Sequence, residues 1–367
     1  MLLIDNAVVA KVLTMADCIA AQERAFAGLV TGESLARPRI DVFAPCDRPD
    51  GYYRWGSTEG VSDGVLAVRL KSDVITWPEA PDGSRTEQKH CMQPGTYCGL
   101  VLLFSTSNGE PLAIMNDGYL QHMRVGGAAG IGTKLLARAG AATLGMIGSG
   151  GMAHTFLQAI LEVRPVRRVR VYSRSAVNRE RYAHEMSEAF GIEVTPVDSP
   201  QEAVKGADIV ATCTDSMGPV LEPDWIEPGM HVVTLGPREI SAATAERFDI
   251  RVRQGGEALN QPETATFRKG ISGGGGAYVA GTPEQQARLP SKHGAVGLRT
   301  EDWPVYTDVI SGKAPGRTRD DQATLYRTIG NWGVQFSSVG AHVFRRAKAL
   351  GLGRELPTEW FLQDIRN

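Results

Sequence analysis

Short apolar runs alternate with longer amphipathic stretches through the middle of the chain. The runs that read as strands cover residues 143–147, 168–172, 192–195, 208–213, 230–236 and 248–252. Helical periodicity fills several of the intervals, most clearly over 151–163 and 175–190, with a shorter helix over 242–247. Strands that alternate with helices predict a parallel sheet covered on both faces, so this region is typical of an α/β fold.

The first 124 residues carry a different pattern. Residues 54–58 and 65–75 read as strands, and the apolar runs 100–104 and 111–115 flank a turn at Asn108-Gly109, which predicts a hairpin. The strand over 65–75 alternates between an apolar face with Leu66, Val68 and Leu70 and a charged face with Arg69, Lys71 and Asp73. Two cations and an acid on one strand face form either a solvated surface or a site. The pattern alone favours the solvated surface.

A helix rich in small residues follows Asp117-Gly118. It carries Arg124 near its start, and its next turns hold Gly126, Gly127, Ala128, Ala129, Gly130 and Gly132. Glycine weakens a helix by propensity. Such a helix is tolerable where another backbone or a cofactor packs closely against it.

The pattern weakens after the last predicted strand of the α/β region. Residues 254–300 show little periodicity and hold four consecutive glycines, Gly273 to Gly276, so this segment is either a mobile lid or a disordered insertion. Helical patterning returns over 321–350. A tail with Trp360 and Phe361 ends the chain, and two aromatic residues predict that the tail docks on the protein.

A glycine turn connects the run 143–147 to the following helix. It fits the dinucleotide fingerprint, with Gly148 for the tight turn, Gly150 for close approach to a pyrophosphate, and Ala153 for packing of the helix on the strand. The candidate cofactor residues of the turn are Gly148, Ser149, Gly150, Gly151, Met152 and Ala153. The turn therefore predicts a nicotinamide dinucleotide, in a Rossmann domain.

The end of the next strand distinguishes NAD(H) from NADP(H). Ser173 stands where an NAD-binding protein has an acid, and Arg174 follows with a guanidinium suited to a phosphate. We therefore expect NADP(H) rather than NAD(H), although Arg174 could also be a solvated residue at a helix start. Arg179 is either a second phosphate contact or an exposed helix charge.

Other residues beyond the strand ends are also candidates, because ligands of parallel sheets lie at the carboxyl ends of the strands. This rule predicts that Thr214, Asp215, Ser216 and Gly236 lie beside the nicotinamide or the substrate. The alternative is that residues 214–216 are plain turn residues.

Composition narrows the function classes. A chain of 367 residues with 42% hydrophobic and 22% charged residues can form two domains, and its formal net charge of -2 offers no general attraction to nucleic acid or to an anionic membrane. No apolar run is long enough to span a bilayer and the amino terminus lacks a signal-peptide pattern, so we expect a cytoplasmic protein. The five cysteines are scattered and odd in number. His90, Cys91 and Cys98 lack the spacing of a zinc site, so no metal is expected.

Taken together, these motifs resemble the ornithine cyclodeaminase and mu-crystallin family, which also contains ketimine reductases and certain amino-acid dehydrogenases. The segments that carry the resemblance are 37–39, 108–118 with Arg124, the glycine turn, 206–214 and 312–317. The resemblance implies a discontinuous α+β substrate-binding and dimerisation domain, made of residues 1–124 and 305–367. It also implies a Rossmann NADP(H)-binding domain over 125–304, with an insertion at about 254–300, and a homodimer.

The resemblance also assigns roles to charged residues of the amino-terminal part. Arg39 and Arg124 match the arginines that hold a substrate carboxylate, a role that suits bidentate guanidinium geometry. Lys71 best matches the catalytic lysine, which supplies or orients the proton that accompanies hydride transfer. Arg69 lies on the same strand face and is the alternative match.

One departure from the family pattern bears on the reaction. Ornithine cyclodeaminases have an aspartate shortly after the glycine that ends the fifth strand. Here the sequence continues from Gly236 through Pro237 and Arg238, and Glu239, expected at a helix start, is the nearest acid. Without that aspartate we do not expect this chain to cyclise ornithine.

Three functions follow from these observations. The leading hypothesis is an NADP(H)-dependent oxidoreductase that acts on a C–N bond of a small carboxylate-bearing imine or amino acid, as an imine or ketimine reductase or an amino-acid dehydrogenase. The first alternative is an ornithine-type cyclodeaminase, an ammonia lyase with no net redox change, in which Glu239 or Asp215 replaces the missing aspartate. The second is a non-catalytic protein that binds NADPH and a small ligand.

Overall fold

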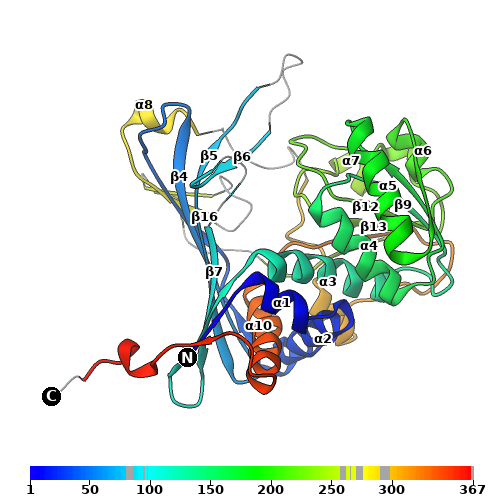
Figure 1. Cartoon of the computed structure of the whole chain (residues 1–367). Helices are drawn as coiled ribbons and strands as arrows, with labels where there is room; N and C mark the ends of the chain where they lie inside the picture. Colours follow the sequence, from blue (N-terminus) through cyan, green and yellow to red (C-terminus); the bar gives the residue numbers. More distant parts are fainter. Residues whose placement is uncertain are drawn as a thin grey trace.

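The computed structural model contains two sheets joined by a long helix. It describes residues 1–79, 86–93, 96, 98–256, 262–264, 266–269, 276–289 and 298–364. Figure 1 shows the two sheets on opposite sides of the molecule, with α3 (Gly118–Leu136) running between them. Within the described residues, no helix combines the length and the apolar character needed to cross a bilayer.

The smaller sheet has seven strands, and all its pairs are parallel. Its strands in spatial order are β11 (Glu193–Pro196), β10 (Arg168–Tyr172), β9 (Thr143–Ile147), β12 (Ile209–Thr212), β13 (His231–Thr234), β17 (Thr324–Arg327) and β14 (Ile250–Arg253). Its helices are α4 (Gly151–Val163), α5 (Ala176–Phe190), α6 (Pro200–Val204) and α7 (Ala242–Ala245). The predicted α/β class and Rossmann-like sheet are confirmed.

One strand of this sheet comes from an unexpected part of the chain. β17 lies between β13 and β14, although its residues belong to a segment that the sequence pattern predicts as helix. All four of its residues are buried, and a short run buried on both faces shows no period that separates a strand from a helix. The smaller sheet therefore includes a strand beyond residue 305, the expected boundary between the two domains. The late helix itself is α10 (Trp332–Ala349).

The larger sheet has eleven strands. Its main path is β15 (Phe267–Arg268), β16 (Gly276–Val279), β3 (Ile40–Ala44), β4 (Gly51–Ser62), β5 (Val65–Thr76), β7 (Cys98–Ser105), β8 (Pro111–Asn116), β1 (Leu2–Ile4) and β18 (Arg354–Glu355). Two further strands lie off this path: β2 (Leu35–Ala36) pairs with β4, and β6 (Gln88–His90) pairs with β5. The helices α1 (Asn6–Val12), α2 (Met15–Thr31) and α10 cluster beside this sheet (Figure 1).

The small residues of α3 allow close packing against the rest of the protein. A Cβ atom on Gly126 would overlap the carbonyl oxygen of Thr155 in α4, and one on Gly132 would overlap the ring of Tyr326 in β17. Of the two explanations offered by the sequence, the one involving another backbone is therefore correct at Gly126. This packing fixes Arg124 near the amino-terminal end of α3.

The segment over 254–300 is more ordered than its sequence pattern predicts. β16 pairs in parallel with β3, and the Tyr52 hydroxyl donates to the Ala280 carbonyl at 2.9 Å. Phe43 and Val279 belong to a small apolar core beneath these strands. The described part of the insertion thus extends the larger sheet, not the Rossmann-like one, and α8 (Pro283–Gln286) follows it. Three residues of the predicted glycine run, 273–275, lie outside the described residues.

The carboxyl-terminal tail does not dock through its aromatic residues, contrary to expectation. Trp360 is 72% exposed and Phe361 is 46% exposed. The tail is held instead by polar contacts: the amino group of Met1 donates to the Leu356 carbonyl at 3.2 Å and to Thr358 Oγ1 at 2.8 Å.

Candidate active site

Three adjoining cavities make up the candidate site. The first, the glycine-turn groove, has a volume of about 690 Å³ and lies at the carboxyl ends of β9, β10 and β12. The second, the middle cavity, has a volume of about 520 Å³ and shares Met152, Thr214 and Leu235 with the groove. The third, the cationic pocket, has a volume of about 160 Å³ and shares Lys71 and Arg124 with the middle cavity. The groove therefore adjoins the middle cavity, which is lined by charged residues of β5 and α3.

The glycine turn has the geometry that a dinucleotide requires. Gly148 has φ +113°, and a Cβ there would overlap the carbonyl oxygen of Cys213. A Cβ on Gly150 would meet no protein atom within 4 Å, so the backbone is open to the groove at the start of α4. The residues of the turn that line the groove are Gly148, Ser149, Gly150, Gly151 and Met152. Ala153 does not line it, because its side chain is fully buried in the core.

The residues at the end of β10 divide into two groups. Ser173 and Arg174 line the groove, and Ser149 donates a hydrogen bond to Ser173 Oγ at 2.9 Å. Arg179 does not line it: its guanidinium donates to the Ser173 carbonyl at 3.1 Å and pairs with Asp198. Asn178 lines the groove instead. Sequence reasoning missed Asn178, whose only signal is its place in the first turn of α5.

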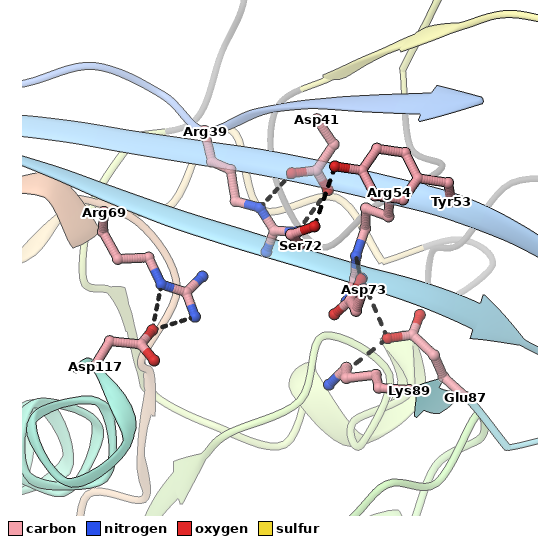
Figure 2. A network of polar contacts seen from close by, with 10 residues as sticks. All are labelled: Arg39, Asp41, Tyr53, Arg54, Arg69, Ser72, Asp73, Glu87, Lys89 and Asp117. Atoms are coloured by element: carbon pink, nitrogen blue, oxygen red, sulfur yellow. Dashed lines mark hydrogen bonds and ion pairs between the residues drawn. The ribbon is translucent and has the colours of Figure 1, made fainter. Parts of the chain in front are cut away.

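The charged face of β5 is buried, so its interpretation as a solvated surface is wrong. Arg69 and Lys71 are each 6% exposed and Asp73 is 3% exposed. Figure 2 shows the ion pairs around them. Arg69 Nε donates to Asp117 Oδ2 at 2.7 Å, and Arg54 donates to both carboxylate oxygens of Asp73 at 2.9 and 2.7 Å. Sequence reasoning missed Arg54 as a site residue. The feature that could have indicated it is an opposite charge on the neighbouring strand, because Arg54 and Asp73 are directly paired in the β4–β5 register.

Arg39 lines both the middle cavity and the cationic pocket, and it forms an ion pair with Asp41. Its guanidinium donates to the two oxygens of Asp41 at 2.7 and 2.5 Å (Figure 2), and the Asp41 side chain is fully buried. Burial disfavours the charged form of Asp41, but the charges of Arg39 and Lys71 outweigh it and lower the pKa of Asp41 to about 2. Asp41 is therefore ionised at neutral pH and holds Arg39 in place.

Lys71 lies among these groups without a bonded partner. It lines both the middle cavity and the cationic pocket, and no hydrogen bond or ion pair joins it to another described residue. Burial, followed by the charges of Arg39 and Arg54, lowers the pKa of Lys71 well below its ordinary value, although Asp41 and Asp73 oppose the shift. An amine in this position can exchange a proton nearer to neutral pH than a solvated lysine can.

Arg124 is a buried cation with neutral partners. Its nitrogens donate to Gln121 Oε1 at 3.1 and 2.8 Å and to Gln335 Oε1 at 3.1 Å, and its guanidinium lies 4.9 Å from the Phe336 ring centre. It forms no ion pair with a carboxylate of the described residues. Burial and the charge of Arg69 lower the pKa of Arg124. A bound anion would relieve this cost.

Amide groups from three helices position Arg124. Gln335 of α10 donates to Gln22 of α2 at 2.6 Å, and Gln22 donates to the Arg124 carbonyl at 3.0 Å. Sequence reasoning missed both glutamines, and no local pattern distinguishes them from other helix residues. The same network fixes the wall of the cationic pocket.

Glu239 is a structural residue of the turn after β13. It is fully buried and begins no helix, because α7 starts three residues later. Its carboxylate accepts hydrogen bonds from the backbone of Leu235 and Gly236, from the backbone and hydroxyl of Thr214, and from the hydroxyl of Thr212. These bonds hold Glu239 away from a substrate.

The predicted residues beyond the strand ends line the cavities. Thr214, Asp215 and Ser216 line both the groove and the middle cavity, and Gly236 lines the middle cavity. Among the described residues, no group of three His, Cys, Asp or Glu side chains is arranged to hold a metal ion. His90 instead shares a hydrogen bond of 3.0 Å with Thr76.

Comparisons with known proteins agree on one family. The family model for ornithine cyclodeaminase/mu-crystallin matches residues 83–349. The chain is 30% identical over 302 residues to the Δ1-pyrroline-2-carboxylate reductase of Bacillus cereus, and the alignment covers 81% of this chain and 82% of that relative.

Two solved structures share the fold over nearly the whole chain. The Thermococcus litoralis Δ1-pyrroline-2-carboxylate reductase in complex with NADH and L-proline has a TM-score of 0.73 at 24% identity, covering 97% of this chain and 100% of that one. An archaeal alanine dehydrogenase dimer with bound NAD has a TM-score of 0.72 at 22% identity, covering 97% and 99%. The resemblance inferred from the motifs is thus confirmed, and the chain belongs to the ornithine cyclodeaminase/mu-crystallin family.

Proposed function

We propose that this protein is an NADP(H)-dependent oxidoreductase that reduces the C=N bond of a small carboxylate-bearing imine, or oxidises the corresponding amino acid. The observation that carries the proposal is the position of Lys71 and Arg124. Both are buried cations without a carboxylate partner among the described residues, and both line cavities that adjoin the glycine-turn groove. A substrate anion held there lies next to a bound cofactor.

In this proposal the arginines bind and orient the substrate. Arg124 offers guanidinium nitrogens whose present partners are neutral amides, so a carboxylate can replace or share those bonds with a gain in charge attraction. Arg39 is fixed by Asp41, so it presents its charge in one orientation. The nicotinamide group, when bound, supplies or accepts the hydride.

Lys71 manages the proton at its Nζ atom. In the reductive direction the protonated amine donates to the imine nitrogen or orients the group that does so, and in the oxidative direction the neutral amine accepts. Its lowered pKa brings the exchange between the two states to a lower pH than for a solvated lysine. Arg69 is the weaker candidate, because Asp117 holds its guanidinium.

The cofactor proposal rests on the groove around the end of β10. A nicotinamide dinucleotide is supported by the glycine turn and by the groove, and by the cofactors bound to the two structures of the same fold. Ser173 and Arg174 line the place where an NAD-binding protein has an acid, which favours the 2′-phosphate of NADP(H). We expect NADPH to bind at least about tenfold more tightly than NADH. Arg174→Ala should remove this preference, whereas Arg168→Ala, at the other end of β10, should not.

One assay tests the reaction. Purified protein is given NADPH or NADH with cyclic ketimines or with mixtures of 2-oxo acid and ammonia, and the nicotinamide absorbance is followed. A parallel reaction holds L-ornithine and NAD⁺, and its ammonia is measured. Consumption of NADPH supports the reductase. Ammonia from ornithine without net redox change would instead indicate a cyclodeaminase, and tight NADPH binding without either reaction would indicate a binding protein.

We also propose a homodimer formed through the outer face of the larger sheet. Leu66, Val68 and Leu70 point to the face opposite the charged site and are only half-buried in one copy. Half-buried apolar residues of β7 and β8 continue the same face. A second copy would cover this surface.

A further inference from the structure

Arg238 is a further cation of the middle cavity, which Arg39, Arg54, Lys71, Lys89, Arg124 and Arg327 also line, and it comes from the opposite side of the site from Lys71. It lies in the turn after β13 of the Rossmann-like sheet, whereas Lys71 and Arg124 come from β5 and α3. All three line the same cavity of about 520 Å³. Arg238 is half-buried and forms no hydrogen bond or ion pair with a described residue.

The turn that carries Arg238 is fixed from two sides. On one side, Glu239 accepts hydrogen bonds from the backbone of Gly236 and Leu235. On the other side, Arg327 of β17 donates to the carbonyl of Pro237 at 2.9 Å. The backbone around Arg238 is therefore held on both sides, and Arg238 lines one wall of the middle cavity.

The charges around this cavity do not match a substrate with a single acidic group. One carboxylate can satisfy Arg124 and Lys71 together, because both line the cationic pocket. Arg238 then still lacks a bonded anion. Glu87, whose charge raises the pKa of Arg238 against the effect of burial, also interacts with Arg54 at 3.4 Å and Lys89 at 3.8 Å. Asp215 lines the same cavity but forms no ion pair with Arg238. A substrate with a cationic side chain would be repelled by Arg238.

We propose that the substrate is a 2-imino dicarboxylate, or the matching amino dicarboxylate, whose second carboxylate binds Arg238. This inference rests on the proposed function and adds the class of side chain. The reaction converts imine, reduced nicotinamide and one proton into amine and oxidised nicotinamide. Hydride goes to the imine carbon and the proton to its nitrogen, while both carboxylates are unchanged.

A binding experiment tests the inference without turnover. The protein loaded with NADPH is titrated calorimetrically with succinate or glutarate, and with butyrate or valerate as monocarboxylate probes of similar length. We expect the dicarboxylates to bind at least about tenfold more tightly, the difference of one charge-assisted hydrogen bond. Arg238→Gln should weaken dicarboxylate binding by about 10- to 100-fold and leave monocarboxylate binding within about threefold. Arg238→Lys should retain part of the preference.

Kinetics and a matched control complete the test. With NADP⁺, L-aspartate or L-glutamate should be oxidised with a higher kcat/KM than L-alanine, L-proline or L-ornithine, and Arg238→Gln should act mainly on KM. Arg247→Gln removes the same charge from an exposed position on the same segment and should change nothing. Equal binding of mono- and dicarboxylates, or an equal loss of NADPH affinity in Arg238→Gln, would overturn the inference. Oxidation of only monocarboxylic amino acids would overturn it and leave the proposed function intact, whereas absence of any net redox reaction would contradict the proposed function itself.

Discussion

Lys71 combines a cost in stability with a role in the proposed reaction. Its folded pKa is lowered, so between that pKa and the ordinary value near 10.4 the unfolded chain binds more protons, and stability rises with pH across this window. We expect Lys71→Met to remove this cost, which leaves Tm at pH 7 unchanged or higher and flattens its pH dependence. The same substitution should lower kcat by about 100-fold or more. Thermal unfolding at several pH values and the NADPH assay measure both effects, and a marked loss of stability would contradict the interpretation.

Asp41 affects both the stability of the fold and the pKa of Lys71. Its pKa of about 2 lies below the unfolded value, so the stability that its charge contributes is present above about pH 4 and is lost as the pH falls toward 2. The Asp41 charge also raises the pKa of Lys71. Asp41→Asn should therefore shift the decline of imine reduction at high pH to a lower pH, by about one unit. The kcat/KM profile measures the shift, and exposed Asp50→Asn, whose partner is Arg48, is the control that should leave the profile in place.

At the scale of elements, close contact between α10 and β4 supports the cationic pocket. A Cβ on Gly333, in the first turn of α10, would overlap the carbonyl oxygen of Glu59 in β4. Two residues further along α10, Gln335 bonds Arg124. We expect Gly333→Ala to destabilise the fold by about 2 kcal/mol and to raise the substrate KM. In Gly140→Ala the new Cβ meets no atom within 4 Å, so this control should keep the wild-type Tm and KM. An unchanged KM in a destabilised Gly333→Ala would show that α10 does not position the site.

The elements also show what sequence patterns could predict. The glycine turn and the strand of Lys71 follow from local periodicity and spacing, which act over neighbouring residues. β17 escaped prediction because a four-residue strand buried on both faces has no period. Arg54 and Gln335 escaped because their partners are distant in the chain, and only the folded register brings Arg54 to Asp73. Arg179, predicted as a phosphate contact or an exposed helix charge, does not line the groove and bonds the Ser173 carbonyl and Asp198 instead.

At the scale of the whole molecule, the chain crosses between the two sheets more than once. After β14 it returns to the larger sheet through β16, and β17 then completes the smaller sheet before α10 reaches the site. The middle cavity and the cationic pocket are consequently built from parts that no single continuous segment contains. The face of the larger sheet turned away from these cavities carries the half-buried Leu66, Val68 and Leu70, and we propose that a second copy covers it.

That face supplies a direct test of the homodimer. Val68, Leu102 and Ile114 are register neighbours across β5, β7 and β8, and each is half-buried in one copy. A carboxylate at the central position would have to be desolvated when two such faces meet, which costs several kcal/mol. We therefore expect wild-type protein to sediment as a dimer at micromolar concentration and Leu102→Asp to sediment as a monomer. Val177→Asp places the same charge on exposed α5 and should remain dimeric. Circular dichroism and NADPH binding check that Leu102→Asp is folded, and a folded Leu102→Asp dimer would move the interface to another surface.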